Sequence, residues 1–236
     1  MKMLSHVSLT HEDVKDQISD PKNRRHSLNM ILAYNTLKKI IEEISTDLKD
    51  EIIDVIFCTG EGELQQTYNF FQALKVQNIA RPIFFQNSLH NSTFGAVSVQ
   101  FQNISSGTTL TSGDLSIENA VEITLSNPSN RLTVILGVDV YPDDLYEVKS
   151  SIYGKNVKLS SGASASLFIP NGHQYFNDYS GIIIKDVIYQ SKDTSSHQFT
   201  NYFATNSLIT LSSATCSGEL IIPRANDKIA TYTLEV

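Results

Sequence analysis

The sequence IIDVIFCTG, at residues 52–60, is a short and nearly all-apolar run, rich in Ile and Val, that ends in Gly60. A run of this kind predicts a strand that is covered on both faces in a parallel sheet. Residues 24–48 place Leu and Ile at spacings of three and four, which predicts an amphipathic helix before the strand. Residues 64–77, LQQTYNFFQALKVQ, predict a second helix after it. The order helix, strand, helix indicates an α/β protein.

The rest of the chain continues this alternation and then changes to strands. Residues 80–93 predict an irregular loop that enters a pocket, before a helical segment at 94–102. A β-branched run at 105–113 and a helical stretch at 114–127 precede RLTVILGVDV, residues 131–140, the clearest buried strand. Further strands are predicted at 163–170, 181–189, 219–224 and 229–236. Because no linker or repeat interrupts the pattern, we expect one domain over residues 1–236.

Composition excludes several classes of function. The 236 residues carry a formal net charge of -7 and no basic cluster of the size that nucleic acid requires. No apolar run is long enough for a membrane span. The N-terminal residues 1–16 become polar too early for a secretory signal, so we expect a cytoplasmic protein. Two cysteines, Cys58 and Cys216, are too few for a disulfide framework or a zinc cluster.

Nucleotide, metal and hydrolase motifs are not evident in the sequence. There is no phosphate-binding glycine loop and no serine elbow, so we predict no cofactor. The acidic residues of Gly60–Glu63 are typical of the start of a helix, and Asp139, Asp143 and Asp144 are typical of a turn. We therefore predict that neither group binds a metal ion. His90 lies in the loop QNSLHN and suits either a general acid or base, or a histidine packed in a loop.

Four segments, taken in order, resemble the N-terminal ketosynthase-like (beta-ketoacyl synthase) family of the thiolase fold. They are TGEGEL at 59–64, PIFFQNSLHNSTFG at 82–95, TTLTSGD at 108–114 and VILGVDVYPDDL at 134–145. The resemblance implies a thiolase-like half-fold, in which helices layer on a mostly parallel five-stranded core sheet that is extended by C-terminal strands. Family members are often chain-length factors encoded beside true ketosynthases, notably for aryl polyene pigments.

The resemblance also implies that condensing activity is missing. An active ketosynthase carries its cysteine at the start of the helix after this strand, where the helix dipole favours the thiolate. Here the matching residues are Thr111, Ser112 and Gly113, and glycine has no side chain to acylate. The second thiolase half, which would supply two histidines, is also not represented. We therefore expect a non-catalytic, chain-length-factor-like subunit for polyketide or fatty acid biosynthesis.

Such a subunit is expected to pair with a catalytic ketosynthase as a heterodimer or heterotetramer, and to meet an acyl carrier protein only indirectly. Pairing would use the strand at Gly107 to Thr111, because an unpaired strand edge needs a partner or a cover. The neighbouring loop would then reach the partner's acyl tunnel, where bulky side chains limit chain length by overpacking. The predicted gate and interface residues are Phe85, Leu89, His90, Phe94, Thr109 and Thr111. Plain core packing is an equally good interpretation of the gate residues.

Two other functions remain open from the sequence. His90 with a carboxylate such as Asp114 would suit an enzyme that dehydrates or hydrolyses an acyl thioester. A self-associating module that binds acyl chains or acyl carrier protein is the third possibility, which the lack of a basic patch disfavours.

Overall fold

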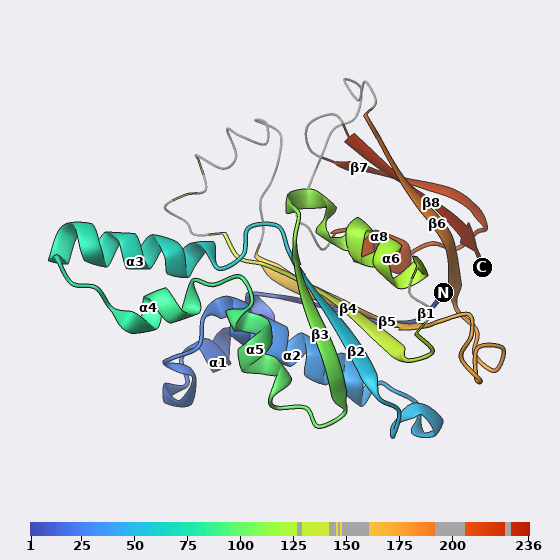
Figure 1. Ribbon diagram of the computed structural model, residues 1–236, viewed down its shortest axis with the longest axis horizontal. Helices are drawn as coiled ribbons and strands as arrows, with labels where there is room; N and C mark the ends of the chain where they lie inside the picture. Colours follow the sequence, from blue (N-terminus) through green and yellow to red (C-terminus); the bar gives the residue numbers. More distant parts are fainter. Residues whose placement is uncertain (127–128, 142–144, 146, 148–160, 192–205, 225–227) are drawn as a thin grey trace.

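The computed structural model is built on one mixed eight-stranded sheet (Figure 1). It describes residues 1–236 except 127–128, 142–144, 146, 148–160, 192–205 and 225–227. The strand order is β3-β2-β4-β5-β1-β6-β8-β7. The strands are β1 (Lys2–Thr10), β2 (Ile53–Thr59), β3 (Ile104–Thr111), β4 (Leu132–Asp139), β5 (Gly162–Ile169), β6 (Ile182–Ser191), β7 (Gly218–Arg224) and β8 (Lys228–Glu235).

Strand directions divide the sheet into a core and an extension. β2 is parallel to both β3 and β4, whereas β5 is antiparallel to both β4 and β1. Four of the five core strands therefore run the same way, which confirms the predicted mostly parallel core. β6, β8 and β7 add to it by antiparallel pairing, as predicted for the C-terminal strands.

The central strand β1 was not predicted from the sequence. Its apolar residues alternate irregularly with polar ones, which conceals the period-2 pattern. Two of the polar residues find partners far along the chain: Lys2 Nζ donates to the carbonyl oxygens of Phe176 and Tyr179, each at 2.6 Å, and His6 Nδ1 lies 2.9 Å from Ser166 Oγ. These contacts join segments more than 150 residues apart. Local patterning cannot reveal them.

Helices cover both faces of the sheet (Figure 1). They are α1 (Lys15–Ile18), α2 (Leu28–Glu42), α3 (Leu64–Gln77), α4 (Pro82–Asn87), α5 (Ser92–Ser98), α6 (Ser116–Ser126) and α8 (Asn206–Ser212), with short 3-10 turns at Glu12–Val14, Pro21–Asn23, Thr46–Leu48 and Gly113–Leu115. α2 and α5 pack on one face around Phe57, and α6 and α8 pack on the other around Ile135. No helix of the described residues is long and apolar enough to cross a membrane.

The helix boundaries refine the predictions. The predicted helix at 24–48 begins only at Leu28, because the Ser27 hydroxyl caps it by accepting from the Met30 N–H at 3.1 Å. The loop predicted at 80–93 instead contains α4, which Pro82 opens at its first position. The helical segment predicted at 94–102 is α5, which begins and ends earlier, at Ser92 and Ser98. The helices predicted at 64–77 and 114–127 are confirmed as α3 and α6.

Candidate functional site

Gly113 lies at the carboxyl end of β3, where it opens the 3-10 turn that leads into α6. Its φ of 61° is in the left-handed region, which favours glycine. A Cβ atom built at this position would meet no other atom within 4 Å. The Ser112 N–H donates to Ser116 Oγ at 2.9 Å, so the turn is held by the helix that follows it. The site therefore has room for a side chain, but Gly113 offers none.

Cys58 is the nearby thiol, and it is unsuited to nucleophilic chemistry. It is fully buried on β2, with its Sγ 3.3 Å from the Ser116 carbonyl oxygen. Burial raises the pKa of the Cys58 thiol well above its usual range, and the charges of Glu118 and Asp139 raise this pKa further. The thiolate is thus disfavoured at this position. Cys216 is exposed and precedes β7.

Asp139 closes the loop after β2 through hydrogen bonds. Its carboxylate accepts from the Gly60 N–H at 2.8 Å and from the Thr59 hydroxyl at 3.1 Å, which ties the ends of β2 and β4 together. Asp143 and Asp144 lie outside the described residues. In the part of the chain that the structure describes, no group of three or more His, Cys, Asp or Glu side chains could hold a metal ion.

Glu63 is a buried carboxyl. The sequence predicted a role only for the acidic stretch Gly60–Glu63 as a whole and did not predict that Glu63 is buried. Only 2% of it is exposed, and its Oε1 accepts from the Ser27 hydroxyl at 2.8 Å and from the Thr93 hydroxyl. Its Oε2 has no hydrogen-bond partner. Burial raises the pKa of Glu63 to about 7, although the hydroxyl hydrogen bonds act in the opposite direction. Glu63 therefore joins the start of α2 to α5 from within the core.

His90 lies against Gly62, the residue before Glu63. Its ring is so close to Gly62 that a Cβ atom on Gly62 would come within 2.7 Å of His90 Cδ2. His90 is exposed in the turn between α4 and α5. Within the described residues, no hydrogen bond or ion pair joins His90 to a carboxylate, so the pair with Asp114 that the sequence suggested stays a prediction.

The predicted gate residues fall into two environments. Phe94 is half-buried on α5, where its ring stacks on Phe57 with centroids 6.5 Å apart. It also lies against Gly107, at which a Cβ atom would come within 1.9 Å of the Phe94 ring. Phe85 and Leu89 are 57% and 50% exposed, and the structure does not bring them into this packing. Phe94 therefore anchors the segment, while Phe85 and Leu89 face away from the core.

The strand β3 forms one end of the sheet, as predicted. Residues 105–108 are exposed, and the inner side of the strand pairs with β2. Thr109 is half-buried opposite Phe57, and Thr111 is exposed opposite Thr59. No described strand pairs with the outer side of β3.

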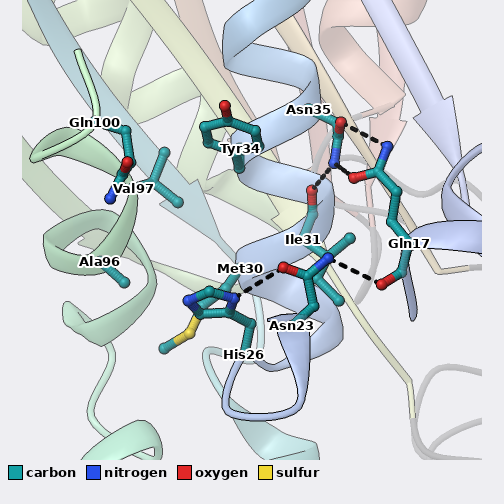
Figure 2. A pocket seen from close by; sticks show the side chains of 10 residues that line it. All are labelled: Gln17, Asn23, His26, Met30, Ile31, Tyr34, Asn35, Ala96, Val97 and Gln100. Carbon is teal, nitrogen blue, oxygen red and sulfur yellow. Dashed lines mark hydrogen bonds between the residues drawn. The ribbon is translucent and has the colours of Figure 1, made fainter. Parts of the chain in front are cut away.

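A separate pocket of about 270 Å³ opens between α2, α5 and the segment before α2 (Figure 2). Its polar side chains largely satisfy one another: Gln17 and Asn35 exchange amide hydrogen bonds of 2.9 and 2.6 Å, and His26 lies 3.3 Å from Asn23 (Figure 2). None of the predicted gate residues lines this pocket, and neither does a carboxylate, lysine or arginine. We assign it no ligand.

Comparison with known proteins identifies the fold. One chain of the solved complex of the ketosynthase ApeO with its chain length factor ApeC, from Xenorhabdus doucetiae, matches with a TM-score of 0.68 and 14% identity, over 99% of each chain. A variant of OleA from Xanthomonas campestris matches with a TM-score of 0.57 and 10% identity, over 100% of this chain and 98% of that chain. At these identities the likeness concerns the fold alone.

The family is established by the sequence itself. No curated protein matches the chain. The family model described as beta-ketoacyl synthase, N-terminal domain, matches residues 16–201, which is more than half of the chain. The chain therefore belongs to the beta-ketoacyl synthase N-terminal domain family and has the thiolase-like fold that its motifs predicted.

Proposed function

We propose that this chain is a non-catalytic, chain-length-factor-like subunit that pairs with a catalytic ketosynthase in polyketide or fatty acid biosynthesis, with aryl polyenes as one product class. The observation that carries the proposal is Gly113. It occupies the turn between β3 and α6, which the resemblance matches to the family's nucleophile position, and the nearby thiol of Cys58 is buried with a raised pKa. A subunit of this kind serves its partner by binding, not by acylation.

The exposed edge of β3 supports the mode of pairing. Residues 105–108 are exposed at the end of the sheet, and no described strand pairs with their outer side, which is the side we assign to a strand of another subunit. The proposed seam is Gly107 to Thr111. The similar fold of a chain from a complex of a ketosynthase with its chain length factor is consistent with this arrangement.

The segment next to β3 is the proposed gate. Phe94 fixes α5 against Phe57 and Gly107, which leaves the exposed Phe85, Leu89 and His90 able to reach the partner. A bulky side chain at the end of an acyl tunnel rejects a longer chain by steric overlap, and a smaller one admits it. In this proposal the complex acts in the cytoplasm, and the acyl carrier protein delivers its substrate to the catalytic subunit.

Co-expression with a ketosynthase encoded beside this chain tests the proposal. One subunit carries a tag, and native mass spectrometry measures what is purified with it. We expect a stable one-to-one or two-to-two complex, and a shift in product length when Leu89 or Phe85 is replaced by alanine. A chain that stays a monomer with every neighbouring ketosynthase contradicts the proposal.

An assay of the isolated chain distinguishes the proposed function from the alternative, an acyl-thioester enzyme that uses His90. We expect no turnover of acyl thioesters by the chain alone, with or without the substitution His90→Ala. Turnover that disappears in His90→Ala would instead support an enzyme that acts without a partner.

A further inference from the structure

Residues 64–89, which we call the arm, extend from the body of the molecule as α3, a turn and α4 (Figure 1). α3 ends at Gln77, and Asn78 follows it with a φ of 52°, which turns the chain back toward α4. α3 has 14 residues, of which only Ala73 is buried. Helices of this length are marginal without tertiary packing. α3 packs mainly on the short helix α4, where Phe70 meets Phe85 with ring centroids 5.7 Å apart.

The arm exposes an unusual amount of apolar surface. Seven of the fourteen exposed large hydrophobic side chains among the described residues lie between positions 71 and 89. They are Phe71, Leu74, Val76, Ile79, Ile83, Phe85 and Leu89. At ~150–200 Å² for each fully exposed side chain, their exposed fractions amount to about 600 Å². A stable interface covers about 800 Å² on each partner. The exposed apolar area of the arm is thus of the same order as one side of an interface, although it is distributed over α3, the turn and α4.

The charges along the chain define the extent of this surface. All 25 acidic residues lie outside residues 64–113, and this stretch carries only two basic residues, Lys75 and Arg81. It includes the arm, α5 and β3, each of which packs on the next. Interface cores are depleted in charged residues and enriched in aromatic ones. The arm is therefore continuous with the exposed edge of β3. The arm has the apolar and aromatic composition of an interface core, whereas β3 is uncharged but rich in Ser and Thr.

We propose that the arm is a second docking surface, which clasps the catalytic ketosynthase subunit beyond the β3 edge. The identity of this occupant rests on the proposed function above. A surface complementary to the arm would be apolar at its centre and would carry acidic side chains opposite Lys75 and Arg81, which are the two basic residues of the arm. Two basic residues are too few for an anionic membrane, which takes clusters of about four to eight.

A triple substitution tests the proposal in the full chain. The arm variant carries Phe71→Gln, Val76→Gln and Ile79→Gln, and glutamine preserves helix propensity in α3. The matched control carries Ile123→Gln, Ile188→Gln and Ile221→Gln, which replace side chains that are 43%, 48% and 48% exposed on α6, β6 and β7. Circular dichroism checks that both variants fold. Isothermal titration with the co-encoded ketosynthase measures the Kd.

We expect the arm variant to bind the ketosynthase at least about 30-fold more weakly, and the control to bind within about threefold of the wild type. Hydrogen exchange of the wild-type chain supplies an independent measurement, since amides of residues 64–89 gain protection when the ketosynthase is added. An unchanged Kd together with unchanged exchange in the arm overturns this proposal while the proposed function stands. If the wild-type chain forms a homodimer and the arm variant does not, the occupant of the arm is a second copy of this chain, and the choice of the ketosynthase is overturned. If the wild type binds no ketosynthase, the proposed function itself fails.

Discussion

Replacing Glu63 by glutamine tests the electrostatics of the buried core beneath the proposed gate. The substitution removes an ionisable group and keeps an oxygen that accepts from the hydroxyls of Ser27 and Thr93. Burial raises the pKa of Glu63 in the folded chain to about 7, from an ordinary value of 4.5. The folded state therefore holds this proton more tightly than the unfolded state does. Below pH 4.5 the Glu63 carboxyl is protonated in both states, so it adds no pH dependence to the free energy of unfolding.

Between pH 4.5 and about 7 the unfolded chain loses the proton and the folded chain keeps it, so the wild type loses stability as the pH rises. Each pH unit in this window costs ~1.4 kcal/mol, or roughly 3 kcal/mol in all. Above pH 7 the loss is complete and constant. Glu63→Gln lacks this contribution, so its stability relative to the wild type should rise by roughly 3 kcal/mol across the window. At pH 5 the variant should be less stable than the wild type. Its amide NH2 group replaces Glu63 Oε2, which has no hydrogen-bond partner, so the two N–H donors are buried without acceptors.

Urea unfolding followed by circular dichroism at pH 5, 6, 7 and 8 measures the difference in unfolding free energy between variant and wild type. Other titrating groups cancel in this difference. Glu43→Gln is the control, because Glu43 is exposed and the same chemical change there leaves the buried Glu63 carboxyl untouched. A difference for Glu63→Gln that is flat from pH 5 to 8 would refute the reasoning, since Glu63 would then ionise alike in both states.

Three further substitutions address the packing, the nucleophile position and the sheet edge. Phe94→Ala should lower the unfolding free energy by about 2 kcal/mol in urea denaturation, because it removes a half-buried ring from Phe57. Gly113→Ala should cost ~1–2 kcal/mol by the same measurement, through backbone strain alone, since its Cβ meets no atom; a neutral result would show that the turn relaxes. Thr108→Glu should weaken co-purification with the ketosynthase by placing a charge on the exposed β3 edge, whereas Ile221→Glu at the opposite edge should leave it intact.

The candidate site was partly accessible from the sequence. The position of Gly113 between a strand and a helix follows from the β-branched run before it and the amphipathic pattern after it. The absence of acidic residues between Glu63 and Asp114 is also visible in the sequence, and it marks the stretch that the structure exposes as the arm and the β3 edge. The burial of Glu63 had no local signal, because an acidic residue before a helix is usually solvated.

The sequence by itself determined the elements whose signal is local. β2 and β4 are apolar runs that are buried in the structure, apart from a partly exposed Asp54, and α3 and α6 follow helical periods over residues 64–77 and 116–126. The family motifs also lie within short segments. Only the tertiary structure decided the rest. The hydrogen bonds of β1 join residues more than 150 positions apart in the sequence. Phe94 is packed and Phe85 is exposed because only Phe94 contacts Phe57 of the sheet. Burial is a property of the assembled chain, and a local pattern cannot encode it when the covering residues are distant in sequence.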